Sequence, residues 1–440
     1  MSTQPARGMR DFLPADVRRR EFVVGVIREV YERYGFEPLE TPAVENIETL
    51  LGKYGEEGNK LIFKILRRGE HEASGEADLA LRYDLTVPLA RVVAECQGKL
   101  PRFFKRYQVQ PVWRADRPAR GRFREFYQCD IDAIGSTSIV VEAELLAAIC
   151  EVMATLGFAD FVVRLNHRRV LIALLESAGV PEAQQGDALV ALDKLEKVGP
   201  DGMAREFAAR GIDGAAASAC LSLFAGDPTE RPHETLARLG QVLGGHNALD
   251  ELASLVGLCE STPAAGRIRV DPSLARGLSY YTGAIMEIAV PDLAGSLGGG
   301  GRYDHLIGMF LGHDVPACGF SLGLERILVV MTERNMFPPS IEHGAVDVMV
   351  TLWSDLTRPE ALALAAELRR AGLRVDVYPE PDKLGKQFKY ASSRQVPFVA
   401  ILGDDERAAG RVALKDMRSG AQQGVPRGDA AAFIKTAIHG

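Results

Sequence analysis

The chain of 440 residues has little cysteine, and its cysteines do not form the patterns that bind zinc or that pair in secreted domains. The six cysteines stand apart, with no CxxC pair and no matching histidine spacing. Structural zinc and disulfides are therefore not expected, and a reducing compartment is favoured. No apolar run reaches membrane-spanning length, and the N-terminal segment MSTQPARGMRDFLP lacks the apolar core of a signal peptide. We expect a cytoplasmic protein without a membrane segment.

The chain also lacks an excess of positive charge. Its formal net charge is −7 and its pI is about 5.8, which argues against a general nucleic-acid coat. Any contact with RNA must then come from local patches. The sequence contains no GKS or GKT, so a P-loop is not expected to hold a nucleotide.

Positive charge is concentrated between Arg102 and Arg124, where eight Lys or Arg accompany one acid, Asp116. Residues 104–135 read as two strands joined by a short cationic loop. Alternate residues of a strand share a face, and one face of the second run would carry the polar series Arg122, Arg124, Phe126, Gln128, Asp130 and Asp132.

Along this face guanidinium groups come first, then an aromatic ring, an amide and finally carboxylates. Arginine suits phosphate oxygens because its planar fork binds two at once. The order therefore predicts a surface on which a nucleotide and a second small molecule lie end to end. The alternative is a solvated hairpin with an ordinary charged face.

The stretch LRYDLTVPLAR, residues 81–91, reads as a strand followed by a helix that opens at Pro88. Asp84 and Thr86 would share one strand face. Thr86 could simply cap the helix. A carboxylate with a neighbouring hydroxyl is also suitable chemistry for the ammonium group of an amino acid.

The stretch LARGLSYYTG, residues 274–283, places Arg276 beside Gly277, where backbone can approach a ligand closely. Tyr280 and Tyr281 would point to opposite faces of an extended chain, so at most one packs simply into the core. Further on, Gly298 to Gly301 form a glycine-lined turn, which indicates a tight sheet crossing or space for a ligand.

The stretch GFSLG, residues 319–323, matches the GxSxG pattern of serine hydrolases around Ser321. That fold needs a downstream acid and then a histidine, and only His343 and His439 follow. A serine hydrolase therefore remains a disfavoured alternative. The same stretch continues into a helix with Glu325 and Arg326 at its start.

The composition divides the chain into two domains, 1–340 and 345–440. Residues from about 168 to 260 are rich in Ala and Leu at helical spacing and predict a helical insertion, in which His167, His233 and His246 are expected to be surface or capping residues. Strands and helices alternate from Val346 onward, which indicates a separate α/β domain.

Taken in order, these segments resemble the class II aminoacyl-tRNA synthetases, and in particular the histidyl-tRNA synthetase family. The resemblance spans nearly the whole chain. Where the family signature usually has Asp, this chain has Ser279. The segments that carry it are Pro42 in motif 1, Asp84-Leu85-Thr86, Arg114 with Arg122–Gln128 in motif 2, Arg276–Tyr281, motif 3 at 319–326, and the domain 345–440.

The resemblance implies an α+β catalytic domain on an antiparallel sheet with a helical insertion, followed by an α/β anticodon-binding domain. It implies a ligase that activates L-histidine with ATP to histidyl-adenylate and transfers it to the 3′ end of tRNA(His). Mg²⁺ would accompany ATP as substrate, with no metal site on the protein, and motif 1 would form a homodimer. In the anticodon-binding domain, Lys383, Lys386, Gln387 and Lys389 are placed for RNA contacts.

The resemblance also assigns residues. Arg114 and Arg276 would be catalytic and neutralise charge on the α-phosphate. The residues implied for histidine binding are Asp84, Thr86, Arg114, Gln128, Asp132, Arg276, Tyr280 and Tyr281. Those implied for ATP binding are Arg114, Asp116, Arg122, Phe126 and Arg326. A non-catalytic regulatory subunit of histidine biosynthesis is the alternative, although such proteins typically lack the C-terminal domain and degrade the Arg276–Tyr281 segment.

Overall fold

The computed structural model describes residues 3–54, 58–67, 75–227, 229–275, 280–342 and 344–439. These residues form two compact units. The first takes the described residues within 3–12 and 20–336, and the second takes those within 13–19 and 337–439.

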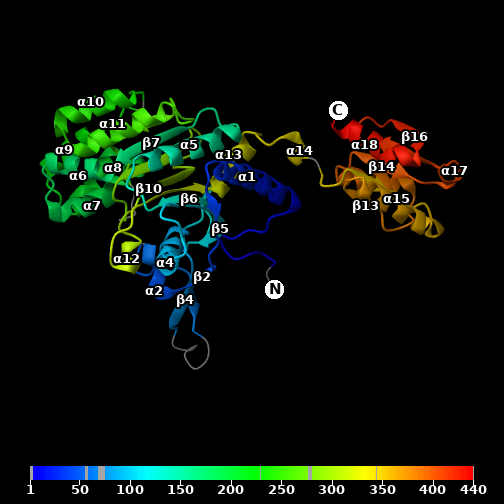
Figure 1. Ribbon diagram of the computed structural model, residues 1–440, viewed down its shortest axis with the longest axis horizontal. Helices are drawn as coiled ribbons and strands as arrows, with labels where there is room; N and C mark the ends of the chain where they lie inside the picture. Colours follow the sequence, from blue (N-terminus) through cyan, green and yellow to red (C-terminus); the bar gives the residue numbers. More distant parts are fainter. Residues whose placement is uncertain are drawn as a thin grey trace. The chain divides into compact units, whose positions relative to one another are not determined.

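The first unit is built on an eight-stranded sheet with the order β1-β5-β6-β11-β10-β9-β7-β8 (Figure 1). Among the described strands, the pairs β1/β5 and β7/β8 are parallel and the other neighbours are antiparallel. The predicted antiparallel α+β fold is confirmed. The strands are β1 (Glu37–Pro38), β5 (Phe104–Trp113), β6 (Glu125–Ile134), β7 (Val162–His167), β8 (Ile268–Val270), β9 (Ala284–Ala289), β10 (Gly298–Arg302) and β11 (Ala317–Gly323).

The helices that pack against this sheet include α1 (Pro14–Arg33), α5 (Val140–Thr155) and α13 (Leu324–Glu333). The apolar residues of α1 recur every three or four positions and are fully buried at Val23, Ile27 and Val30. The hydroxyl of Tyr31, on the same stripe, donates to the carbonyl oxygen of Cys129 on β6 at 3.2 Å. The odd-numbered face of β6 is thus covered by helix, which leaves its even-numbered face for a ligand.

A second, three-stranded sheet with the order β2-β4-β3 leads into the helix that carries Thr86. Its elements and their neighbours are β2 (Val44–Asn46), α2 (Ile47–Leu50), β3 (Lys64–Leu66), β4 (Ala77–Leu81), α4 (Thr86–Cys96) and α12 (Gly308–Leu311).

The predicted helical insertion is present between β7 and β8. His167 and His246 act as helix caps, as expected: the Nδ1 of each accepts a backbone N–H, from Arg169 at 3.1 Å and from Ala248 at 3.3 Å. His233 is exposed. The helices of the insertion are α6 (Arg168–Ser177), α7 (Glu182–Leu192), α8 (Leu195–Ala209), α9 (Gly214–Phe224), α10 (Pro232–Leu243) and α11 (Asn247–Cys259).

The second unit is a five-stranded sheet with the order β13-β12-β14-β15-β16, covered by helices. The alternation of strands and helices was predicted, whereas α17 and β16 were not. Its elements are α14 (Pro339–Glu342), β12 (Val348–Val350), η2 (Asp355–Thr357), α15 (Arg358–Arg370), β13 (Val375–Val377), α16 (Leu384–Ser393), β14 (Phe398–Ile401), α17 (Asp404–Ala408), β15 (Arg411–Asp416), β16 (Gln422–Pro426), η3 (Arg427–Asp429) and α18 (Ala430–His439).

Gln387 has a structural place in this unit. Its side chain is fully buried, and its Nε2 donates to the carbonyl oxygens of Leu352 (2.9 Å) and Asp382 (2.7 Å) while its Oε1 accepts from Leu352 N. The expectation that Gln387 is placed to contact RNA was wrong, because every polar group of its amide is used to hold backbone.

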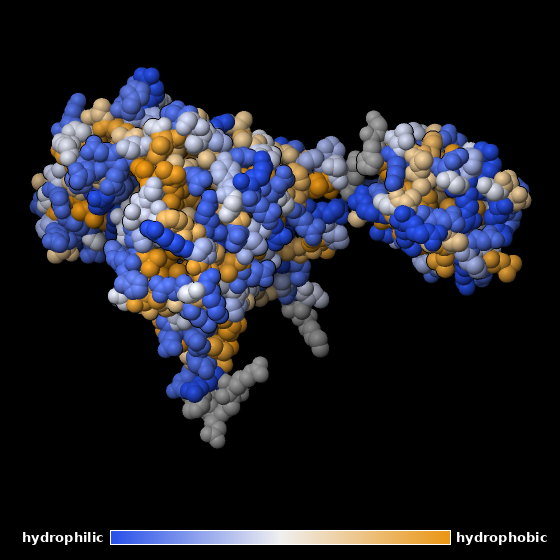
Figure 2. Space-filling model, viewed as in Figure 1, coloured by the Kyte–Doolittle hydropathy of each residue, from blue (hydrophilic) through white to orange (hydrophobic). Residues whose placement is uncertain are grey.

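Hydrophilic residues predominate on the face of each unit shown in Figure 2, and hydrophobic residues appear there in smaller patches. None of the helices in the described ranges is both long enough and apolar enough to cross a membrane.

Candidate active site

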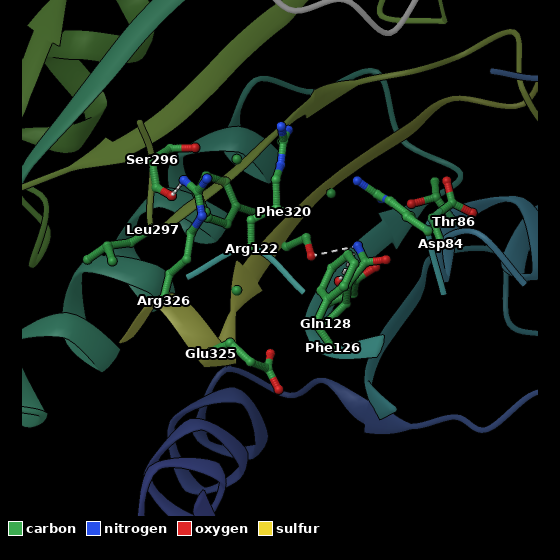
Figure 3. Close-up of a pocket in the computed structure, with 18 of the residues that line it drawn as sticks. Asp84, Thr86, Arg122, Phe126, Gln128, Ser296, Leu297, Phe320, Glu325 and Arg326 are labelled. Atoms are coloured by element: carbon green, nitrogen blue, oxygen red, sulfur yellow. Dashed lines mark hydrogen bonds between the residues drawn. The ribbon is translucent and has the colours of Figure 1, made fainter. Parts of the chain in front are cut away.

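A pocket in the first unit brings the predicted site residues together (Figure 3). Arg276 and its neighbours through Ser279 lie outside the described residues. The other predicted residues all line this pocket: Asp84, Thr86, Arg114, Asp116, Arg122, Phe126, Gln128, Asp132, Tyr280, Tyr281 and Arg326.

Glycines form the floor of the pocket. A Cβ at Gly300 would lie 2.1 Å from the carbonyl oxygen of Gly319, and one at Gly298 would lie 2.6 Å from that of Ser321. Strands β10 and β11 can therefore pair only because these positions carry no side chain. The run is strand β10 and not the predicted turn, because it pairs with both β9 and β11. The tight crossing of strands is confirmed, and these glycines also line the pocket.

Buried carboxylates occupy one end of the pocket. Gln128, Asp130 and Asp132 follow one another on the even-numbered face of β6, and all three are buried. The fully buried guanidinium of Arg106, on β5, lies 2.8 Å from Asp132, and the hydroxyl of Tyr303 donates to the same carboxylate.

Burial controls the protonation of these carboxylates. Removal from water raises the pKa of Asp130 to about 7, although the Arg106 guanidinium and the Ser321 hydroxyl act against the rise. Burial also raises the pKa of Asp132 above its usual range, again opposed by Arg106 and by the Tyr303 hydroxyl. This end of the pocket therefore favours a cation or an added proton.

Asp84 lies at the start of α4. The helix opens at Thr86 rather than Pro88, and the carboxylate of Asp84, not the hydroxyl of Thr86, caps it by accepting from Val87 N at 3.1 Å. The Tyr54 hydroxyl donates to the same oxygen, Oδ1, at 2.9 Å. Burial raises the pKa of Asp84. The expectation that Thr86 caps the helix was wrong, because Asp84 takes this place while it also lines the pocket.

Three guanidinium groups, those of Arg114, Arg122 and Arg326, also line the pocket. Arg114 Nε donates to the carbonyl oxygen of Tyr83 at 3.0 Å, and its Cζ lies 4.3 Å from the centre of the Tyr83 ring and 5.2 Å from that of Phe126. The Nε atom of Arg122 lies 3.6 Å from the Oδ2 atom of Asp116. In Figure 3, Arg326 lies on the opposite side of the view from Asp84 and Thr86.

Two loops hold Arg326. Its Nη1 donates to the carbonyl oxygen of Ser296. A Cβ at Gly121 would lie 3.1 Å from Arg326 Cγ, and one at Gly295 would lie 3.0 Å from Nη1. Both glycines have positive φ, a backbone conformation that favours glycine. The absence of a side chain at each position also leaves room for Arg326.

Comparisons with known proteins agree with this geometry. The family profile described as histidyl-tRNA synthetase matches residues 8–327, and the anticodon binding domain profile matches residues 347–437. The chain belongs to the histidyl-tRNA synthetase family. It is 42% identical to the histidine–tRNA ligase of Porphyromonas gingivalis and 41% identical to that of Gloeobacter violaceus, covering 98% and 97% of each chain respectively.

Solved structures give the same result for the fold. The crystal structure of histidyl-tRNA synthetase from Nostoc sp. PCC 7120 matches 99% of this chain with a TM-score of 0.82 and 32% identity. The apo histidyl-tRNA synthetase of S. aureus, at 22% identity, matches with a TM-score of 0.69 and supports the fold alone.

The structure corrects two details of the predicted surface. Strand β6 begins at Glu125, so the polar face does not extend back to Arg124, which instead donates from Nε to the carbonyl oxygen of Asp116 at 3.0 Å. Tyr280 and Tyr281 do not point to opposite faces. Their ring centres lie 5.0 Å apart and both line the pocket. Both residues precede β9, which begins only at Ala284, so the alternation of a strand does not apply to them.

Sequence reasoning missed several residues that shape the site. Asp130 was placed on the correct face without a role, although its period-two spacing with Gln128 and Asp132 was the signal that could have found it. Arg106 lies on β5 and Tyr303 directly follows β10, and they reach Asp132 only because the sheet brings these segments beside β6.

Glu325 links three elements beside the pocket. Its buried carboxylate accepts from Arg20 Nη1 of α1 and from the backbone N–H of Tyr127 on β6, each at 2.9 Å. The Arg20 guanidinium also stacks on Tyr127, with Cζ 4.8 Å from the ring centre. Glu325 therefore fixes motif 3 against motif 2, one residue before Arg326.

Ser321 does not form a nucleophile elbow. It lies within β11, paired with Asp130 and Gly299, and its Oγ accepts from Gln128 Nε2 at 2.9 Å. The elbow requires a serine on a sharp strand-to-helix turn with a histidine in reach. None of the described residues that line the pocket is a histidine.

Proposed function

We propose that this protein is a histidine–tRNA ligase, which uses ATP to activate L-histidine and transfers it to the 3′ end of tRNA(His). The observation that carries the proposal is full-length similarity to relatives of that name, 42% identical over 98% of both chains. The pocket supports it, because its guanidinium groups suit a polyphosphate and its buried carboxylates suit a basic amino acid.

ATP would lie toward the arginine end. In this arrangement Arg122 and Arg326 bind the polyphosphate, Phe126 and the Arg326 guanidinium face the adenine ring, and Asp116 orients Arg122. Mg²⁺ would enter with ATP as part of the substrate, held chiefly by phosphate oxygens and water.

L-Histidine would lie at the carboxylate end. Asp84 and Thr86 bind its ammonium group, and Asp132, Gln128 and Tyr281 bind its imidazole ring. The family resemblance adds Tyr280 as a further contact. A site built to hydrogen-bond a polar side chain rejects analogues that lack it by roughly 10⁴-fold or more.

The first chemical step joins these two ligands. A carboxylate oxygen of histidine attacks the α-phosphorus of ATP, the bond to the β-phosphate oxygen breaks, and pyrophosphate leaves. Arg114, at the junction, and Arg276 neutralise the charge that develops on the α-phosphate. Fixed orientation of the two reactants supplies much of the remaining acceleration. In the second step a hydroxyl of the terminal ribose of tRNA displaces AMP.

The proposal extends to the organisation of the protein. Residues 1–340 would form the catalytic domain and residues 345–440 the anticodon-binding domain, which the anticodon binding domain profile supports. A homodimer formed through motif 1 and a cytoplasmic location belong to the same proposal.

ATP–pyrophosphate exchange against all twenty amino acids tests the proposal. We expect exchange with histidine alone, followed by charging of tRNA(His). Arg276→Ala should abolish exchange, whereas Arg231→Ala, which removes an exposed arginine from the insertion, should not. A regulatory subunit would bind histidine without any exchange, and that outcome would replace the ligase by the alternative function.

A further inference from the structure

The carboxylate end of the pocket holds more buried negative charge than the neighbouring cation can offset. Asp130 and Asp132 are 1% and 2% exposed. The Nη2 atom of Arg106 lies 2.8 Å from Asp132 but 4.0 Å from Asp130. The strand register explains the difference, because Asp132 pairs with Arg106 on β5, whereas Asp130 pairs with the neutral Gln108.

Neutral groups also meet Asp130 on its other sides. Ser321 is its partner on β11, and Gln128 Nε2 reaches its Oδ1 only at 3.5 Å. The charged and titratable groups that interact electrostatically with Asp130 are Arg106 and Arg82, Asp132 and Asp84, the thiol of Cys129 and the hydroxyl of Tyr31.

A buried carboxylate whose nearest cation is distant and shared with a second carboxylate is stabilised by taking up either a proton or a cationic ligand. The rise of the Asp130 pKa to about 7 corresponds to the first outcome. The second outcome requires a ligand whose positive charge reaches the even-numbered face of β6, beyond the ammonium site at Asp84.

We propose that Asp130 is a specificity-determining residue that makes the pocket select its amino acid by the basicity of the side-chain ring, in addition to the ring's shape. The inference rests on the proposed function. The ring is held as a cation whose charge Asp130 balances, while Arg106 balances Asp132.

The donors and acceptors agree with this arrangement. An imidazolium ring has two N–H donors and no acceptor. The face of β6 offers two carboxylates and also Gln128 Oε1, a buried oxygen that has no hydrogen-bond partner among the described residues. A neutral imidazole would leave one ring nitrogen as an acceptor facing these oxygens, unless a carboxyl group kept its proton.

The pH dependence of binding is not the sharpest test. The complex contains one extra proton in either case, whether Asp130 is protonated beside a neutral ring or Asp130 is ionised beside a cationic ring. A pH titration of binding therefore does not distinguish these two states. The basicity of the ring does distinguish them. In 2-fluoro-L-histidine both ring nitrogens are kept, but the adjacent fluorine makes the ring far less basic.

The experiment measures kcat/KM in ATP–pyrophosphate exchange for histidine and for 2-fluoro-L-histidine at pH 7. We expect the wild-type protein to prefer histidine by roughly 10- to 100-fold, the range for a hydrogen bond to a charged group. Asp130→Asn should remove most of this preference by losing activity on histidine while keeping activity on the analogue. The KM for ATP should change by no more than about twofold, because ATP binds at the other end of the pocket.

Asp84→Asn is the matched control, because it removes a buried carboxylate from the ammonium end of the same pocket. It should weaken both amino acids alike and leave the preference intact. Equal use of the two amino acids by the wild-type protein would overturn the inference, and this comparison needs no variant to fold. A preference that survives in Asp130→Asn would also overturn it. Absence of exchange with histidine in the wild-type protein would overturn the proposed function itself.

Discussion

Gly319 lies directly across the sheet from Asp132, and a Cβ at Gly319 would fall 1.9 Å from the Asp132 Oδ1 atom. The carboxylate therefore occupies the volume that the side chain of any residue other than glycine would need at position 319. The buried carboxylate of Asp132 and the backbone of Ile131 both surround this position. Displacing either of them costs free energy, because the interior is closely packed.

Gly319→Ala should for this reason displace Asp132 and close the proposed ring site. We expect kcat/KM for histidine in pyrophosphate exchange to fall by roughly 100-fold or more, the effect of a misplaced group in an active site. Gly257→Ala is the control, because Gly257 lies on α11 with no atom within 4 Å of the added Cβ. It should keep full activity. An active Gly319→Ala protein would show that the Asp132 position is not required.

Asp130→Asn should stabilise the empty protein in a pH-dependent way. The pKa of Asp130 is about 7 in the folded state against about 3.9 in an unfolded chain, so the folded state binds the extra proton between these values. The contribution of Asp130 to the stability of the wild-type protein therefore falls as the pH rises from about 4 to 7. Asp130→Asn has no carboxyl group at this position and therefore does not show this pH-dependent loss of stability.

The advantage of Asp130→Asn should be small at pH 4 and grow to at most about 4 kcal/mol near pH 7, at 1.36 kcal/mol per pKa unit. Urea unfolding of both proteins at several pH values, without histidine, measures it. A difference that is independent of pH would contradict the assignment. Greater stability with less activity is the usual sign of a site strained for function.

The pair of Arg20 and Glu325 should couple α1 to motif 3. Arg20→Met and Glu325→Gln should each destabilise the protein by roughly 3 kcal/mol, because each leaves a buried group without its partner. The double variant should lose less than the sum, with a coupling of about 1 kcal/mol or more. Arg231 and Glu234, an exposed pair, should show a coupling below about 0.5 kcal/mol in the same urea experiments. Equal coupling energies in the two pairs would contradict the assignment of Arg20 and Glu325 as the link between α1 and motif 3.

Gln387→Leu should loosen the second unit rather than alter RNA contacts. It removes the partners of both backbone groups of Leu352, at a cost of about 1–3 kcal/mol for a buried polar group left unsatisfied. Hydrogen exchange of residues 348–352, read by mass spectrometry, should accelerate. Lys389→Ala, an exposed change on the same helix, should leave exchange unchanged. If Gln387→Leu weakened the affinity for tRNA without faster hydrogen exchange, the result would support a direct contact between Gln387 and RNA.

Local features of the sequence predicted much of what the structure contains. The Ala- and Leu-rich stretch with helical spacing, from about residue 168 to 260, predicted the helical insertion, because an apolar stripe at 3.6-residue spacing needs a helix to be buried. The alternation of polar and apolar residues from Phe126 to Asp132 placed the ligand face of β6. These predictions succeeded because their signals lie within one element.

The sequence alone indicated the family, the strand that presents Gln128 and Asp132, and many of the residues that line the pocket. Only the tertiary structure decided which of the two carboxylates on β6 lies closer to the cation. That depends on the register of β5 against β6, which sets Arg106 opposite Asp132 and leaves Asp130 opposite Gln108. Strand register is fixed by packing across the whole sheet, and no spacing within a single strand encodes it.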